Sequence, residues 1–236
     1  MFYPIYLDLR HRNVLMVGGG PIATGKVSGL LEAEACVTVV APEVSDAIVQ
    51  WHSERKLIWH AREFVESDIE NQFVVIAATD DKALNARVYQ LANAQQRVAN
   101  AVDDLDNCNF IAPAIARQGE LQVAISTAGK SPALAKQLRD RIQAEILTEE
   151  TSALADFLGS WRPEVKRWLP TYQRRQAFWE GVLESCVPSL LMADNKTHAE
   201  ETMNEFLHRA QSPSNPYACC VVNPDEFAHC KTCCGV

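Results

Sequence analysis

The sequence lacks three features that would assign a protein to a broad class at once. No apolar run approaches the roughly 18 residues of a membrane-spanning helix, and the N-terminus lacks the basic, apolar and small-residue succession of a signal peptide. No block of basic residues occurs, and 22 Lys and Arg against 30 Asp and Glu give a net charge of −8. We therefore expect a soluble cytoplasmic protein that binds neither membranes nor nucleic acid, since phosphate backbones require a clustered positive surface.

The eight cysteines are distributed unevenly along the chain. Because an extracellular disulfide framework would be spread more evenly, and no secretion signal is present, we expect reduced thiols. The C-terminal segment has enough thiols for zinc or an iron-sulfur cluster, but their spacing matches no site that we can name. A tail that binds metal only adventitiously is therefore favoured over a functional metal site, whose candidate ligands are Cys230, Cys233 and Cys234.

Apolar residues make up 47% of the 236 positions, enough for one large domain or two modest ones. Short β-branched runs alternate with segments of helical apolar spacing through the first hundred residues, a pattern typical of a doubly wound parallel sheet. The expected strands are 14–17, 37–40, 57–60, 73–78 and 98–102, and the expected helices are 21–33, 47–55 and 82–94.

The pattern changes after residue 110. Two apolar runs, 110–116 and 121–126, are joined by a polar link that contains Gly119, which predicts an antiparallel hairpin. Ser131 and Pro132 suit the cap and first position of a helix over 133–147. The chain then has a helical pattern up to about residue 209, with breaks expected near 162–163, 169–170 and 187–188.

A glycine motif, Gly18-x-Gly20-x-x-Ala23, follows the first expected strand and opens the first helix. In this context glycines let a pyrophosphate approach the backbone, and the helix N-terminus supplies unpaired N–H donors. Because Glu43, and no arginine, follows the second strand, NAD is preferred to NADP. The expected cofactor-binding residues of this Rossmann-type fold are Gly18, Gly20, Pro21, Ile22, Ala23, Pro42, Glu43, Thr79 and Asp80.

Two further segments contain candidate catalytic or ligand-binding residues. Asp103, Asp104 and Asp106 follow a strand end, where a carboxylate can take the proton that accompanies hydride loss, although a solvated turn would have the same composition. Gly129-Lys130-Ser131-Pro132 at a helix start, with basic residues along the helix, suggests a polyanionic ligand. An ordinary capped helix explains the second segment equally well.

Taken together, the motifs resemble those of the precorrin-2 dehydrogenases of siroheme synthesis, a family that includes the N-terminal module of siroheme synthase. The resemblance covers about residues 1–147. It rests on five motifs in order: 17–23 with Lys26, 77–81, 100–104, 110–114 and 124–135. In the family's pattern an arginine usually precedes Lys26, where this chain has Gly25, and some relatives have a second serine at Thr127.

The resemblance implies a homodimer that oxidises precorrin-2 to sirohydrochlorin with NAD. The family's essential aspartate falls on Asp103, and the eight carboxylates of precorrin-2 account for the basic helix start. The substrate-binding residues are then expected to be Ser126, Thr127, Gly129, Lys130 and Ser131. The fold implied is a Rossmann-type NAD-binding domain (1–112), a small α+β dimerisation region (113–147), a helical C-terminal domain (148–211) and a cysteine-rich tail (212–236).

Two alternatives stay open. In the first, the same pocket also inserts Fe²⁺ or Co²⁺, with Asp103 helping to remove pyrrole protons. In the second, the chain is a nucleotide-responsive carrier that holds a tetrapyrrole or a metal without catalysis. The length of the sequence leaves no room for a methyltransferase domain, so the trifunctional siroheme synthase is not expected.

Overall fold

The computed structural model describes residues 2–211, which form two units. One unit consists of the chain up to Pro113 together with Ser126–Pro132, and the other consists of Ala114–Ile125 and the helices from Ala133 onward. The cysteines of the C-terminal tail, including Cys230, Cys233 and Cys234, lie outside the described residues.

The first unit is built on a five-stranded parallel sheet, as the alternating pattern predicts. The strand order is β3-β2-β1-β4-β5, so the chain runs outward from β1 and then returns to the other side of it. All four neighbouring strand pairs are parallel. The strands are β1 (Asn13–Val17), β2 (Cys36–Val40), β3 (Ile58–His60), β4 (Val74–Ala77) and β5 (Val98–Ala101).

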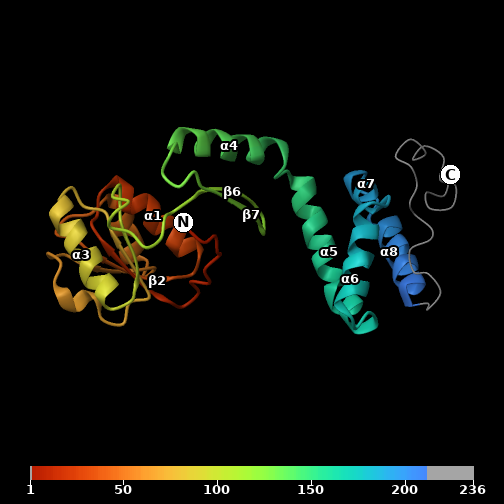
Figure 1. Cartoon of the computed structure of the whole chain (residues 1–236), viewed down its shortest axis with the longest axis horizontal. Helices are drawn as coiled ribbons and strands as arrows, with labels where there is room; N and C mark the ends of the chain where they lie inside the picture. The colour runs from red at the N-terminus through yellow and green to blue at the C-terminus, as the bar shows by residue number, and fades with distance from the viewer. Residues whose placement is uncertain (1, 212–236) are drawn as a thin grey trace. The chain divides into compact units, whose positions relative to one another are not determined.

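Helices cover both faces of this sheet (Figure 1). On one face, α1 (Pro21–Glu32) and α2 (Asp46–Ser53) bury Ala23, Val27, Leu30 and Ile48 against the sheet. On the other face, α3 (Lys82–Ala94) and the 3-10 turn η1 (Glu66–Ile69) bury Val88, Ala92 and Ile69. The central strands therefore have no solvent-facing side, which explains their unbroken apolar runs.

The second unit begins with a hairpin of β6 (Ala114–Gln118) and β7 (Leu121–Ile125). Helix α4 (Pro132–Glu145) follows, and Ala135 is its one buried residue. Four further helices, α5 (Glu149–Trp168), α6 (Tyr172–Leu183), α7 (Val187–Met192) and α8 (Lys196–Gln211), pack around a core that includes Phe157, Phe178 and Met203. Within residues 2–211, no helix is long and apolar enough to cross a membrane.

Two expectations about local structure are wrong. The first hairpin strand begins at Ala114 instead of residue 110, because Phe110 packs into the core of the first unit and its carbonyl accepts a hydrogen bond from Asn100 Nδ2 at 3.0 Å. Helix α5 also continues through Pro163, where a break was expected. Buried Phe157 and Val165 anchor the helix on both sides of the proline, and this packing offsets its cost of about 3 kcal/mol.

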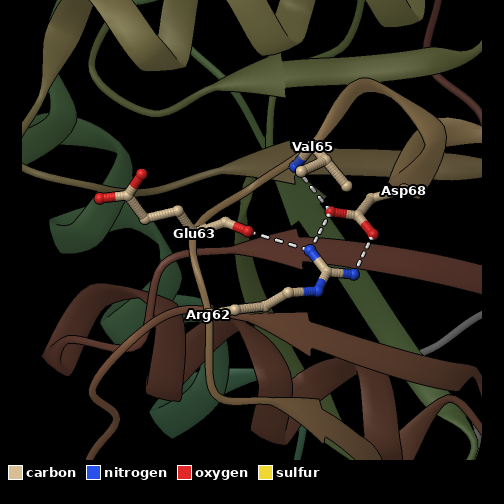
Figure 2. A network of polar contacts seen from close by, with 4 residues as sticks. All are labelled: Arg62, Glu63, Val65 and Asp68. Atoms are coloured by element: carbon tan, nitrogen blue, oxygen red, sulfur yellow. Dashed lines mark hydrogen bonds and ion pairs between the residues drawn. The ribbon is translucent and has the colours of Figure 1, made fainter.

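A polar network closes the connection between β3 and β4 (Figure 2). The Arg62 guanidinium donates two hydrogen bonds to the Asp68 carboxylate, at 2.8 and 2.6 Å, and one to the Glu63 carbonyl oxygen at 2.9 Å. The Val65 N–H donates to the same carboxylate at 2.9 Å. The Asp68 side chain is only 9% exposed, whereas the Arg62 side chain is 42% exposed, so the carboxylate is buried but its partner still reaches solvent.

The Asp68 pKa lies below its ordinary value. Burial raises this pKa, but the hydrogen bonds from Arg62 and Val65 lower it by more. A carboxyl whose pKa is lower in the folded state stabilises the fold above its unfolded pKa of about 3.9, and this stabilisation is lost as the pH falls through the folded pKa.

We therefore predict that Asp68→Asn lowers the opening free energy of the sheet at pH 7 by about 1–3 kcal/mol and makes it less dependent on pH below 5. Hydrogen exchange of the Val74–Ala77 amides measures both effects. The matched control is Glu66→Gln, because Glu66 pairs with Arg87 with both side chains more than 60% exposed. Equal losses in the two variants would contradict the prediction.

Candidate functional site

The turn between β1 and α1 is held tightly against two neighbouring strand ends. Gly18 has a φ of +116°, and a Cβ atom there would collide with the carbonyl of Ala78 after β4. A Cβ on Gly19 would collide with the backbone of Glu43 and Val44 after β2. The Gly18 N–H donates to the Val40 carbonyl, and the Ser45 N–H donates to the Gly19 carbonyl, both at 3.0 Å. Both positions therefore require glycine.

Gly20 differs from the other two glycines of the turn. It caps α1 with a φ of −75°, which any residue can adopt, and no atom lies within 4 Å of its Cβ position. No side chain caps the N-terminus of α1, and its first turn contains no acidic residue. The N–H groups of this turn, next to exposed Pro21 and Ile22 and buried Ala23, therefore suit a phosphate group.

The other expected cofactor residues lie at the same edge, where parallel strands end. Pro42 and Glu43 follow β2, and Asp80 follows β4, and all three are exposed. Thr79 is half-buried, and its hydroxyl donates to Asn85 Oδ1 at 2.7 Å. Asn85 Nδ2 in turn donates to the Thr79 carbonyl at 2.9 Å. Thr79 therefore shapes the rim and does not present a free hydroxyl.

The aspartates after β5 have different surroundings. The Asp104 carboxylate accepts hydrogen bonds from the N–H of Asp106, from the N–H of Asn107 and from Asn107 Nδ2, the last at 2.8 Å. The side-chain hydrogen bond from Asn107 is the main reason that the pKa of Asp104 is lowered. Asp103 is exposed and has a φ of +61°. Asp104 thus organises the turn, and Asp103 is exposed shortly after the end of β5, at the carboxyl edge of the sheet.

The predicted substrate segment packs against this turn. A Cβ on Gly129, which has a φ of +79°, would meet the Cδ1 atom of Leu105. Ser126 Oγ accepts from the Ala128 N–H, and Thr127 Oγ1 accepts from the Ser131 N–H, both at 3.0 Å. The segment is therefore a closed loop next to Leu105 of the aspartate turn, with the Lys130 side chain exposed.

Two polar residues that position the site, Asn85 and Ser45, were missed in the candidate list drawn from the sequence. Asn85 holds Thr79, as described above. Ser45 holds the start of α1, because its Oγ atom lies 2.7 Å from Thr24 Oγ1, which donates to the Gly20 carbonyl. The signal for Asn85 was a polar residue on the buried face of a helix, where an apolar one is usual.

The described residues contain no group of three or more His, Cys, Asp or Glu side chains that could hold a metal ion. Cys108 lies in the aspartate turn, where burial and the nearby charges of Asp104 and Asp106 raise the pKa of its thiol. Its protonated thiol donates to the Leu105 carbonyl at 3.3 Å.

Comparison with known families divides the chain into three consecutive matches. A model described as putative NAD(P)-binding matches residues 5–114. A model of the sirohaem biosynthesis protein central region matches residues 118–145, and one of the sirohaem synthase dimerisation region matches residues 150–207. The three matches together leave only short segments of residues 5–207 unassigned.

Curated relatives and a solved structure agree with these matches. Siroheme synthase 1 of Klebsiella pneumoniae is 40% identical over 210 residues, which cover 89% of this chain and 44% of the relative. Siroheme synthase of Neisseria meningitidis serogroup C is 38% identical over 208 residues, covering 88% and 43%. The chain thus spans less than half the length of these relatives. The solved structure of SirC, a precorrin-2 dehydrogenase, is 28% identical with a TM-score of 0.71, covering 86% of this chain and 100% of that chain.

The surroundings of Gly18, Gly20 and Gly29 predict a different outcome for each when it is replaced by alanine. Gly18→Ala costs roughly 2–4 kcal/mol of stability, because its Cβ meets backbone at a positive φ. Gly20→Ala keeps the stability but weakens NAD binding about tenfold or more, since its methyl group fills the open space at the helix start. Thermal denaturation and NAD fluorescence titration measure the two effects.

Gly29→Ala is the matched control, since Gly29 lies on α1 with nothing within 4 Å of its Cβ position. We expect this variant to gain about 0.5–1 kcal/mol of stability with unchanged NAD affinity. Equal NAD affinity of Gly20→Ala and the unmodified chain would show that no phosphate group lies at the start of α1.

Proposed function

This chain belongs to the family of precorrin-2 dehydrogenases and siroheme synthase N-terminal modules, and from that premise we propose that it oxidises precorrin-2 to sirohydrochlorin with NAD. One observation carries the proposal. The exposed Asp103 lies at the same sheet edge as the open helix start at Gly20, and the Lys130 segment packs against its turn. A base, a dinucleotide site and a cationic loop therefore converge within the first unit.

The start of α1 fits the pyrophosphate of a dinucleotide. The uncapped N–H groups after Gly20 supply donors, and the absence of a side chain at Gly20 leaves room for close approach. The exposed carboxylate of Glu43 after β2 accepts hydrogen bonds from ribose hydroxyls and repels a 2′-phosphate, which favours NAD over NADP. When bound, NAD supplies the hydride acceptor.

Asp103 is the proton acceptor of the reaction. Oxidation of the substrate removes a hydride, which leaves with the cofactor, and a proton, which passes to the Asp103 carboxylate, so two electrons and two hydrogens are accounted for. Asp104 is unsuited to this role, because hydrogen bonds from Asn107 and from the turn occupy its oxygens.

The segment from Ser126 to Ser131 binds the substrate carboxylates. Its N–H groups at Ala128, Lys130 and Ser131 are already used inside the loop. Groups available to the ligand include the Lys130 ammonium and the hydroxyl hydrogens of Ser126 and Thr127, whose oxygens act as acceptors within the loop. This local charge attracts a polyanion to a protein with a net charge of −8.

A second candidate activity is insertion of Fe²⁺ or Co²⁺ into the product. The matches to siroheme synthases favour it, and the Asp103 carboxylate would also accept pyrrole protons as the metal enters. The metal is a substrate of this step, consistent with the lack of a resident metal cluster among residues 2–211.

We further propose that the chain forms a homodimer. Residues 150–207 match the sirohaem synthase dimerisation region. The hairpin and helix α4, within residues 113–147, need additional packing contacts to be stable. An isolated two-stranded hairpin is marginally stable in water, and α4 buries only Ala135 while Leu134 is 46% exposed. Both regions therefore belong to the proposed interface.

We propose the cytoplasm as the site of the reaction. NAD is available there, and the reducing conditions would keep free thiols such as Cys36 and Cys108 reduced.

The proposed function predicts NADH formation when the chain is incubated anaerobically with precorrin-2 and NAD. Absorbance at 340 nm and the spectrum of the tetrapyrrole measure it. Asp103→Asn lowers kcat/KM by about 10²–10⁴-fold, because the proton acceptor is lost, while asparagine tolerates the same positive φ. The affinity for NAD stays within about twofold.

Asp106→Asn is the control, because Asp106 is also exposed in the same turn. Normal turnover by Asp103→Asn would refute the assigned role. Binding of NAD and precorrin-2 without NADH formation by the unmodified chain would favour the carrier alternative. If siroheme forms faster than its spontaneous rate after Fe²⁺ is added to the product, the chain also has chelatase activity.

Sedimentation velocity tests the dimer, which should have twice the chain mass of 26.2 kDa. Leu134→Glu places a charge on the exposed apolar side of α4 and should shift the equilibrium toward monomer by tenfold or more, equivalent to about 1.4 kcal/mol. A monomer at micromolar concentrations of the unmodified chain would contradict the proposed assembly.

A further inference from the structure

The segment that connects β2 to α2 is held at both of its ends. At its start, the Ala41 carbonyl accepts a hydrogen bond from Trp59 Nε1 at 3.0 Å. At its end, the Ser45 N–H donates to the Gly19 carbonyl at 3.0 Å. Glu43 lies between these two anchors, exposed at the rim. The place of Glu43 relative to the glycine turn therefore depends on how firmly the second anchor holds.

Ser45 adds a side-chain contact to this second anchor. It occupies the N-cap position of α2, but its side chain does not cap that helix, as a serine there usually does. Its Oγ atom lies instead 2.7 Å from Thr24 Oγ1, which donates to the Gly20 carbonyl at 2.9 Å. Since the Thr24 hydroxyl has one hydrogen, the Ser45 hydroxyl is the donor between the two side chains. The start of α2 is thus bonded to the start of α1.

Packing leaves the segment little room beside the glycine turn. Val44 contacts the core of the sheet unit, and its Cα atom lies 2.8 Å from the position that a Cβ on Gly19 would occupy. Both hydroxyls of the Thr24–Ser45 pair are half-buried, so solvent competes for them less than at an open surface. The pair is a contact between side chains, so it can be removed while the backbone hydrogen bonds are kept.

We propose that Thr24 and Ser45 are positioning residues that fix Glu43 relative to the start of α1 and thereby determine the preference for NAD over NADP. The inference rests on the proposed function, in which Glu43 binds ribose hydroxyls and the start of α1 binds the pyrophosphate. Both groups belong to one ligand, so a fixed spacing avoids the cost of ordering the segment on binding. A carboxylate that cannot move away also repels a 2′-phosphate more strongly.

Isothermal titration calorimetry with NAD and with NADP tests the preference. Thr24→Val keeps the shape of the side chain without its hydroxyl. We expect the NAD Kd to rise about tenfold and the NADP Kd to change by less than about twofold, because a released Glu43 binds the ribose less well but also repels the 2′-phosphate less. Ser45→Ala should act alike, and the double variant should add little, since both changes remove one contact. Thr24→Ser keeps a hydroxyl and should retain the preference.

Thr202→Val is the matched control. Thr202 lies on α8 in the second unit, and its hydroxyl donates to the carbonyl four residues earlier at 2.8 Å, as that of Thr24 does. This variant should leave both Kd values unchanged. An unchanged ratio of the two Kd values in Thr24→Val and in Ser45→Ala would overturn the proposal, whether both affinities fall together or neither changes.

Hydrogen exchange gives a readout that needs no cofactor. The Ser45 amide should exchange about tenfold faster in Thr24→Val, because the contact beside its hydrogen bond to Gly19 is lost. The Gly18 amide, which donates to the Val40 carbonyl, should keep its rate. Equal acceleration at both amides would overturn the proposal, since the substitution would then loosen the whole turn.

These measurements separate the inference from the reaction proposed above. If the unmodified chain binds NAD but forms no NADH from precorrin-2, the proposed reaction fails, and the Kd ratios still decide the role of Thr24 and Ser45. If the unmodified chain binds neither dinucleotide, both the proposed function and this inference are refuted.

Discussion

The close approach of three loops at the carboxyl edge of the sheet is the constraint on which the rest of the site depends. Gly18 and Gly19 lie so near the backbone after β4 and β2 that neither position has space for a Cβ atom. This contact sets where α1 begins and which direction its free N–H groups face. It also fixes the ends of β2 and β4 relative to that helix, so the rim is shaped by backbone packing rather than by side chains.

Polar residues at this rim fall into two groups with different consequences. The side chains of Asp104, Thr79 and Asn85 form hydrogen bonds within the rim, so they have few groups available for a ligand. Asp103, Lys26 and Lys130 are not held in this way, and all three carry a formal charge. Their proximity to an uncapped helix start gives a negatively charged protein a local site for anions and for proton transfer.

Much of the fold could be predicted from the order of apolar runs. Strands buried on both faces have continuous β-branched sequences, and β1, β2 and β4 were located to within a residue or two. Predictions failed where packing between distant segments overrides local preference. Pro163 stays in α5 because buried residues hold both halves of the helix, and Phe110 leaves the hairpin because it belongs to another core.

The sequence by itself determined the glycine turn, the positions of the aspartates and the segment around Lys130, because each depends on residue type and spacing along the chain. The resemblance singled out Asp103 among the three aspartates, and the closed turn supplies the physical reason, since hydrogen bonds from Asp106 and Asn107 occupy the carboxylate of Asp104. The tertiary structure decided which distant segments meet: Val102 and Phe110, which flank the aspartate turn, pack against the core cluster that contains Ala23 and Val27 of α1, and the charge of Asp103 raises the pKa of Lys26 on that helix. Charges that distant along the chain interact only after burial of the apolar residues beside them has brought the segments together.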